Sequence, residues 1–166
     1  MKKLILIRGP ICSGKSTTVL ALQKALGKYS VIDQDSLKRA IDNKNPSEWR
    51  DKIAFDTTLF LANSLMKQGR DIIADIHSNI RRQYSEYSKL ALKHDYKLFS
   101  FLLYPPLNTC LVRNRKRKIP DVRYKITDET IKKYWKNPYR VKNEIIFDTS
   151  ILKTKTVVAK ILKIIL

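Results

Sequence analysis

Residues 9 to 16 read Gly9-Pro10-Ile11-Cys12-Ser13-Gly14-Lys15-Ser16. The stretch matches the phosphate-binding pattern G-x-x-x-x-G-K-[ST], in which four positions are fixed. Residues 4–7, just before it, have the composition of a short buried strand, and residues 17–26 after it carry apolar side chains at helical spacing. A glycine turn that only caps a helix would not explain this order of strand, loop and helix. The sequence therefore predicts a P-loop that binds a nucleoside triphosphate.

The backbone and side chains of this loop suit a triphosphate and its metal ion. Successive N–H groups of the turn, with the free N–H groups at the start of the following helix, form a concave site for phosphate oxygens. Lys15 is expected to reach the β and γ phosphates, and the Ser16 hydroxyl is expected to ligate Mg²⁺. We therefore expect ATP, or another nucleoside triphosphate, and Mg²⁺ as cofactors, held by residues 9–16 and Thr17.

The length of 166 residues fits one domain, so that a single site must carry the whole function. Only four apolar residues lie between Lys3 and Arg8, and no apolar run approaches the length of a membrane helix. The two cysteines, Cys12 and Cys110, have no spacing typical of a metal site or a disulfide framework. We expect a cytoplasmic protein that has no membrane partner; the sequence leaves its oligomeric state open.

The net charge of the chain is +19, and it is unevenly distributed. Residues 111–142 hold twelve lysines or arginines against three acids, a local net charge of +9. A basic surface raises the local concentration of polyanions, which favours a nucleic acid as partner. The alternative is that lysine-rich composition reflects the base composition of the genome rather than a binding surface.

Apolar, β-rich runs alternate with helical patterns along the chain, as is typical of a parallel sheet with crossover helices. The expected fold is α/β, a three-layer α/β/α arrangement of the P-loop NTPase type around a five-stranded parallel sheet. The expected strands are residues 3–8, 30–33, 71–75, 97–104 and 144–148. The expected helices are residues 14–26, 35–41, 47–68, 81–94, 107–117, 127–135 and 155–165. The last helix is apolar and basic, which fits packing on the sheet better than contact with a membrane surface.

Ligands of open α/β sheets bind beyond the carboxyl ends of the strands, so the polar residues at those ends are the candidates for chemistry. Asp33 or Asp35 can serve as the base that takes a proton from an attacking hydroxyl, although Asp35 can equally be an ordinary helix cap. Asp75 can hold the hydration shell of Mg²⁺, or can be a structural hydrogen-bond acceptor. His77 can contact substrate or can be an incidental polar loop residue.

Two arginines further along the chain share one face of an expected helix. Arg113 and Arg117 are four residues apart, and two guanidinium groups on one face suit the phosphates of a nucleotide. One of them can stabilise the charge on the transferring group. The alternative is that both are exposed basic residues on a solvated face.

Taken together, these motifs resemble the phage-type polynucleotide 5′-hydroxyl kinases, within the adenylate-kinase-like group of P-loop kinases. The resemblance rests on their content and order along most of the chain. The segments that carry it are MKKLILIRGP with SGKST, VIDQDSLKRAI, IIADIHSNIRR, VRNRKR, ITDETIKKYW and IIFDTS.

The resemblance implies a role for each matching residue. Asp35 falls at the general base, and Lys38 falls where the family has an arginine that contacts the phosphate next to the acceptor hydroxyl. Asp75 and His77 fall at the acid and the asparagine that follow the third strand, on the substrate side. Arg113 falls at the first arginine of a small helical lid, here a basic segment at about 111–142, and Arg117 at the catalytic one.

The sequence departs from the family pattern at three places. Cys12 replaces a usual glycine of the phosphate loop. Lys38 replaces an arginine and so loses the bidentate fork. Residues 118–125 form an extra stretch within the lid, and its role and the pairing of the lid helices stay open.

Three functions are compatible with the sequence. The first is an ATP- and Mg²⁺-dependent kinase that phosphorylates a hydroxyl of a nucleic acid, most simply the 5′-hydroxyl end of RNA or DNA. The second is a kinase of the same group that acts on a nucleoside, an antibiotic or another metabolite. The third is a binding protein in which a nucleotide orders the lid and the basic face holds nucleic acid without modifying it.

Overall fold

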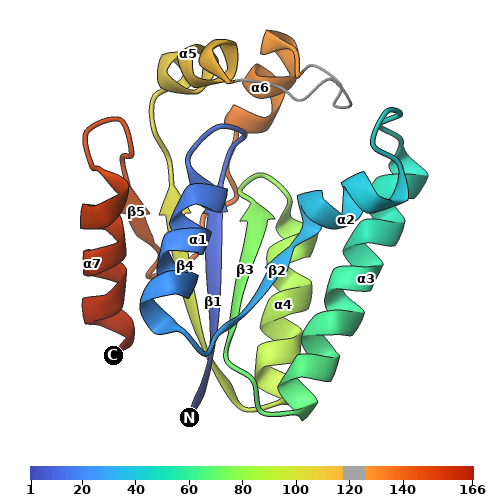
Figure 1. Cartoon of the computed structure of the whole chain (residues 1–166), viewed down its shortest axis with the longest axis vertical. Coiled ribbons are helices and arrows are strands. Elements are labelled where there is room, and N and C mark those ends of the chain that lie inside the picture. The colour runs from blue at the N-terminus through green and yellow to red at the C-terminus, as the bar shows by residue number, and fades with distance from the viewer. Residues whose placement is uncertain (118–125) are drawn as a thin grey trace.

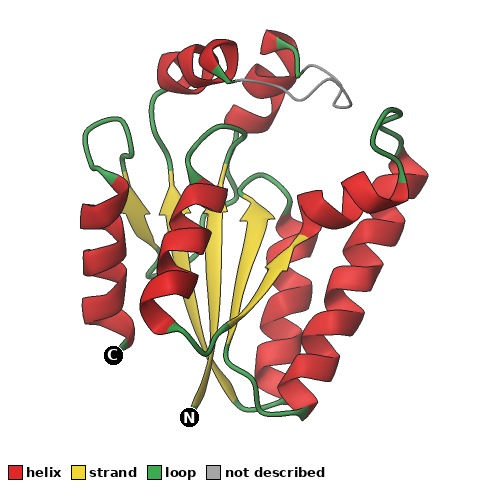
Figure 2. Cartoon of the chain, viewed as in Figure 1, coloured by secondary structure: helices red, strands yellow, loops and turns green. Residues whose placement is uncertain are grey.

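The computed structural model describes residues 1–117 and 126–166. Its centre is a sheet of five strands, all parallel, in the order β2-β3-β1-β4-β5 (Figures 1 and 2). The strands are β1 (Lys2–Gly9), β2 (Ser30–Asp33), β3 (Ile72–His77), β4 (Tyr96–Leu103) and β5 (Ile145–Phe147). The helices of the described residues are α1 (Lys15–Leu26), α2 (Gln34–Ile41), α3 (Glu48–Lys67), α4 (Arg81–Lys93), α5 (Leu107–Lys116), α6 (Asp128–Trp135) and α7 (Thr154–Ile165). The five-stranded α/β/α fold expected from the sequence is confirmed.

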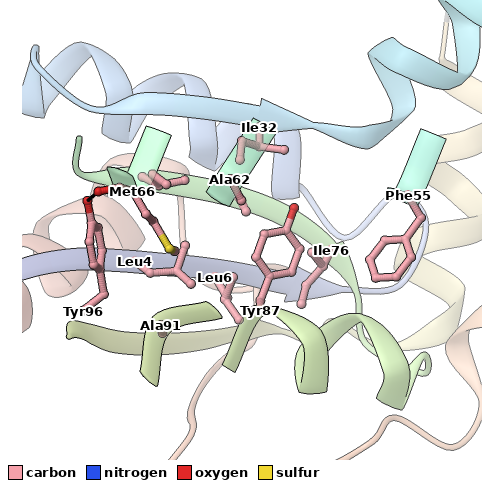
Figure 3. Packing of buried hydrophobic residues seen from close by; sticks show 12 residues of the cluster. Leu4, Leu6, Ile32, Phe55, Ala62, Met66, Ile76, Tyr87, Ala91 and Tyr96 are labelled. Carbon is pink, nitrogen blue, oxygen red and sulfur yellow. Dashed lines mark hydrogen bonds between the residues drawn. The ribbon is translucent and has the colours of Figure 1, made fainter. Parts of the chain in front are cut away.

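Helices cover both faces of the sheet, which is why the strands are apolar almost throughout. Successive residues of β1 point to opposite faces, so Leu4 and Leu6 pack with α3 and α4, and Ile5 and Ile7 pack with α1 and α7. Figure 3 shows the first of these layers, in which Tyr87 and Met66 lie against Leu4 and Leu6. The second layer includes the apolar side of α7, which therefore packs on the sheet as expected.

The register of the strands brings their carboxyl ends to one edge. Gly9 of β1 is opposite His77 of β3, and Asp33 of β2 is opposite Asp75 of β3. β3 continues two residues beyond the predicted end at Asp75, because Arg8 and Gly9 of β1 supply it with pairing partners. The polar residues that follow β1, β2 and β3 therefore lie side by side.

Helices α5 and α6 lie beyond this edge of the sheet, above the phosphate loop in the view of Figure 1. Trp135 fixes the end of α6, since its ring stacks on Tyr104 at 5.1 Å and its indole N–H donates to the Pro105 carbonyl at 2.9 Å. Arg115 of α5 forms an ion pair with Asp128 of α6 at 2.7 Å. The extra stretch 118–125, whose role the sequence left open, lies outside the described residues. In the part of the chain described, no helix has the length and apolar character needed to cross a membrane.

Candidate active site

An open cleft runs along the carboxyl edge of the sheet, with a volume of about 1140 Å³. The phosphate loop and the start of α1 form its floor, helices α2 and α3 form one wall, and α5, α6 and the turn after β5 form the other. Of the residues to which we assigned a role at the acceptor or at the transferring phosphate, all but Asp33 and Asp75 line it. These lining residues are Lys15, Asp35, Lys38, His77, Arg113 and Arg117.

The phosphate loop has the backbone that a close approach to phosphates requires. Gly14 has a φ of 96°, in the left-handed region that glycine enters without steric cost. A Cβ on Gly9 would lie 2.4 Å from Ser13 Oγ and 2.5 Å from the Leu103 carbonyl oxygen, so only glycine fits there. Cys12 also has a positive φ, 62°, and carries a side chain at a position where the conformation favours glycine.

Arg113 ties the loop to the turn after β5. Its Nη1 donates to the Cys12 carbonyl at 3.3 Å and to Thr149 Oγ1 at 3.0 Å, and its Nη2 donates to the Thr149 carbonyl at 2.5 Å. Thr149 Oγ1 in turn donates to the Ser13 carbonyl at 2.8 Å. Arg113 thus lies beside the phosphate loop and also holds the loop in shape. Apart from the position of the Asp-Thr-Ser turn, nothing in the sequence pointed to this bond with Thr149.

Lys15, Ser16 and Asp75 meet at the end of the loop. Lys15 Nζ donates to the Pro10 carbonyl at 2.9 Å and lies 3.9 Å from Asp75 Oδ1, and Ser16 Oγ donates to Asp75 Oδ2 at 3.1 Å. Burial raises the pKa of Asp75 to about 6; Lys15 opposes this, and the carboxylates of Asp35 and Asp33 add to it. A hydroxyl beside a carboxylate suits Mg²⁺, which keeps most of its water and takes few protein ligands.

The donor set suits that metal rather than one held in a protein cage. No group of three or more His, Cys, Asp or Glu side chains among the described residues is placed to enclose a metal ion. A bound Mg²⁺ would be held by Ser16, by the carboxylate of Asp75 and by phosphate oxygens.

Asp33 and Asp35 have different roles, which the sequence alone did not separate. Asp33 is the N-cap of α2, because its carboxylate accepts from the backbone N–H groups of Asp35 at 2.9 Å and Ser36 at 3.3 Å. Helix α2 therefore begins at Gln34, one residue before the predicted start, and Asp35 is not the cap. Its carboxylate instead lines the cleft and has solvent access. Desolvation raises the pKa of Asp35, but the positive charges around it, among them the ammonium groups of Lys38 and Lys15, outweigh it and hold that pKa below its usual value.

His77 lies at the end of β3, next to the cleft. Its ring packs on Tyr134 of α6 with centroids 5.0 Å apart, and its backbone N–H donates to Gln83 Oε1 at 2.9 Å. Burial, with a contribution from the charge of Lys15, lowers the pKa of His77 to about 3. The ring is therefore neutral at pH 7. Its position on the wall of the cleft leaves it open to contact by a bound molecule.

The wall beside Asp35 contains an ion-pair network that sequence reasoning missed. Lys38 Nζ lies 3.2 Å from Asp51 Oδ2, and Arg50 donates to Asp51 Oδ1 from Nε at 3.1 Å and Nη2 at 2.8 Å. Arg39 also lines the cleft and bonds Ser36 Oγ at 2.6 Å. Asp51 stands one helical turn from the Ser47 cap of α3, where an acid is ordinarily read as a helix-stabilising charge. This is why the pattern did not single it out.

Arg117 follows α5 directly and lines the cleft near the phosphate loop. Burial raises the pKa of the Cys12 thiol, although the charge of Arg117, aided by Lys15 and Arg113, opposes the shift. Arg117 therefore lies near Cys12 of the phosphate loop. The cleft does not include Arg81 or Arg82, which lie over the rings of Tyr139 and Phe55 instead.

Comparison with known proteins shows the family and the fold of the chain. A family model described as an AAA domain matches residues 4–138. The chain belongs to this AAA domain family. No curated protein matches the sequence.

Solved structures similar to this AAA domain chain share its fold at low identity. A putative kinase from Chloroflexus aurantiacus has 13% identity and a TM-score of 0.78, over 98% of this chain and 97% of that one. The APS kinase of Mycobacterium tuberculosis, in complex with AMPPNP and APS, has 15% identity and a TM-score of 0.68, over 98% and 96%. The Pnkp1/Rnl/Hen1 RNA repair complex has 16% identity and a TM-score of 0.70, over 81% of this chain and 43% of that one. The AAA domain chain therefore has the fold of P-loop kinases.

One buried group of this AAA domain holds the loop side of the sheet to the segment after α6. Arg8, at the end of β1, is fully buried and forms an ion pair with Glu144. Its other nitrogen donates to the carbonyls of Ser78 at 3.1 Å and Tyr139 at 2.6 Å. A buried charge of this kind is tolerated only when it is paired and hydrogen-bonded. The network fixes the chain between α6 and β5, and so places the outer wall of the cleft.

Proposed function

We propose that this chain is an ATP- and Mg²⁺-dependent kinase that phosphorylates a hydroxyl of a nucleic acid, most simply the 5′-hydroxyl end of RNA or DNA. The observation that carries the proposal is the position of Asp35, whose carboxylate lines the same cleft as the phosphate loop and whose low pKa keeps it ionised. A base on one wall and a triphosphate site on the floor are the two parts that phosphoryl transfer to a hydroxyl requires.

The residues divide the reaction between them. Asp35 accepts the proton as the acceptor oxygen forms its bond to the γ phosphorus, and the bond from that phosphorus to the β–γ bridging oxygen breaks to release ADP. Lys15 and Arg117 bind the phosphoryl oxygens, on which charge accumulates in the transition state. Mg²⁺, when bound at Ser16 and Asp75, supplies further charge neutralisation.

The acceptor assignment rests on the shape and the charge of the cleft. Its volume of about 1140 Å³ leaves room for an acceptor beside the nucleotide, and Lys38 and Arg39 of α2 line it together with Asp35. Two cations beside a base suit the phosphate that follows a 5′-terminal nucleoside. The basic residues of segment 111–142 point the same way, and an RNA repair complex is among the similar structures.

A second function, phosphorylation of a small metabolite, is favoured by the Lys38–Asp51 pair. Asp51 already neutralises the ammonium of Lys38, which reduces its attraction for a polyanion. An APS kinase in complex with AMPPNP and APS shares the fold. In this case the arginines of α5 would serve only the nucleotide phosphates.

A panel of acceptors separates the two functions. The protein is incubated with Mg²⁺ and γ-labelled ATP together with 5′-hydroxyl RNA, 5′-hydroxyl DNA, nucleosides, APS and gluconate. We expect label on the oligonucleotides, with a KM that rises steeply with salt because phosphate contacts release counterions. Label on the small molecules alone would establish the second function. An Asp35→Asn protein that labels as fast as the parent would overturn the catalytic assignment in both.

A further inference from the structure

A second hollow lies outside the cleft, on the other side of α6. Its volume is about 530 Å³, and it opens widely to solvent. Two lysines of α6 and the lysine that follows it contribute its positive charge, and a glutamate opposes it. The lining residues are Asn79, Glu129, Lys132, Lys133, Lys136 and Asn137.

The three lysines of this hollow are not used by the fold. All are exposed, and none forms an ion pair or a hydrogen bond through its side chain with another residue in the described ranges. Other cations of the basic segment differ: Arg113 holds the phosphate loop, and Arg115 is paired with Asp128. The positive charge that these lysines bring to the hollow is therefore available to a ligand.

The hollow adjoins the candidate acceptor site. Tyr134 lines the cleft and follows Lys133 directly in α6, and His77, which also lines the cleft, precedes Asn79 by two residues. The rings of Tyr134 and His77 pack with centroids 5.0 Å apart. At this contact, which we call the Tyr134–His77 boundary, α6 meets the segment 77–79, and both contribute residues to the cleft and to the hollow.

Asn79 adds a polar side chain to the lining of the hollow. Its side-chain oxygen is buried and has no hydrogen-bond partner among the described residues. The groups of the hollow that are exposed to a ligand are therefore chiefly the lysines, which bind phosphate.

We propose that this hollow of Lys132, Lys133 and Lys136 binds the phosphates of the single-stranded polynucleotide whose 5′ end lies at Asp35, a few nucleotides from that end. The inference rests on the proposed function and adds the path of the acceptor strand. A small acceptor would be held entirely within the cleft and would have no use for cations beyond the Tyr134–His77 boundary. A basic groove that follows a backbone is the usual way in which single strands are held without regard to sequence.

The length of the acceptor tests this path. A triple variant, Lys132→Ala, Lys133→Ala and Lys136→Ala, is compared with the parent on two acceptors, a nucleoside 3′-monophosphate and a 5′-hydroxyl oligonucleotide of about 20 nucleotides. We expect the variant to raise KM for the oligonucleotide only. The slope of log KM against log salt should fall by about 0.7 for each phosphate contact that is lost.

Two further variants sharpen the test. Lys93→Ala, Lys160→Ala and Lys163→Ala together remove the same charge from exposed positions on α4 and α7, and they should leave both KM values and the salt slope unchanged. Glu129→Gln removes the acid that lines the hollow, and it should lower KM for the oligonucleotide while leaving that for the monophosphate as it was.

The outcomes distinguish a failure of the proposed strand path from a failure of the proposed kinase function. If the α6 variant affects both acceptors equally, or neither, or if the control triple has the same effect, the path through the hollow is wrong while the kinase assignment stands. If no acceptor is phosphorylated by the parent protein, the proposed function itself fails, and the path of an acceptor strand fails with it.

Discussion

The two halves of the cleft are built differently. On the donor side the site is made of backbone: Gly9 and Gly14 allow the turn, and Arg113 and Thr149 bond its carbonyls. On the side that we propose for the acceptor, it is made of charged side chains of two helices. These are Asp35, Lys38 and Arg39 of α2 and Arg50 and Asp51 of α3.

This difference separates the features that the fold requires from those that can vary between proteins of the same fold. A backbone nest accepts any triphosphate of the right geometry, and its sequence must keep the glycines that allow it. Side chains on helices can change without altering the sheet, so the acceptor half is where kinases of one fold differ. A substitution in one half should therefore leave the binding properties of the other half unchanged.

The largest effect is expected for Asp35→Asn, which removes the base and keeps the size of the side chain. The rate of phosphoryl transfer should fall by about 10²- to 10⁴-fold, the usual contribution of a general base. Affinity for ATP, measured by calorimetry, should stay close to that of the parent. A matched loss of ATP affinity would show that Asp35 belongs to the donor half.

The next largest effect concerns Asp75, in the donor half, and the dependence of the free energy of unfolding on pH. Asp75 has a pKa of about 6 in the folded protein, well above the ordinary value near 3.9, because it is buried. Between these values the folded state holds a proton that the unfolded state has released, so stability is greatest below the window and falls as pH rises through it. The cost above pH 6 amounts to at most about 3 kcal/mol.

Asp75→Asn should remove this dependence. Urea unfolding of parent and variant at several pH values gives the difference in unfolding free energy, and we expect the variant to gain relative to the parent as pH rises from about 4 to about 6. His77, with its lowered pKa, acts in the opposite direction in both proteins, so it cancels from the difference. A difference that does not vary with pH would contradict the burial of an ionised Asp75.

Gly9→Ala tests the backbone of the donor half. The added Cβ would meet Ser13 Oγ and the Leu103 carbonyl, and because a carbonyl of β4 cannot yield easily, we expect a loss of about 1–3 kcal/mol with weakened ATP binding. Gly27→Ala is the control: it has a positive φ of 66° but nothing within 4 Å of its Cβ. That variant should lose stability from backbone strain alone and bind ATP normally.

The smallest effect is expected for Cys12→Gly. Its left-handed conformation costs a side-chain-bearing residue about 1–2 kcal/mol, and the extra freedom of an unfolded glycine returns about 0.5–1 of that. The variant should therefore be more stable by about 0.5–1 kcal/mol, with unchanged transfer, as measured by thermal and urea unfolding. A destabilised variant would mean that the thiol has packing value that outweighs the strain.

The two halves also differ in how much of their structure could be predicted from the sequence. The loop pattern predicted the strand, turn and helix of the donor half, because the pattern specifies backbone geometry. Asp33 and Asp35 could not be separated, since the segment Asp33-Gln34-Asp35-Ser36 offers an acid at two positions either of which can cap a helix. The structure assigns the cap to Asp33, which leaves Asp35 in the cleft.

Other features depended on contacts between distant segments, which a linear pattern does not contain. The bond from Arg113 to Thr149 joins residues 36 apart in sequence, and the buried pair of Arg8 and Glu144 joins residues 136 apart. The extension of β3 to His77 depended on the length of its neighbour β1. Each required the order of the strands in the sheet before it could be anticipated.

The central claim is that the cleft joins a triphosphate site to a base that activates the 5′-hydroxyl of a nucleic acid. The most direct test is a single-turnover reaction of excess protein with γ-labelled ATP, Mg²⁺ and a short 5′-hydroxyl RNA or DNA, followed by identification of the labelled end of the product. The account predicts label at the 5′ end for the parent and a rate at least about 100-fold lower for Asp35→Asn. No label on any oligonucleotide, or equal rates for the two proteins, would contradict it.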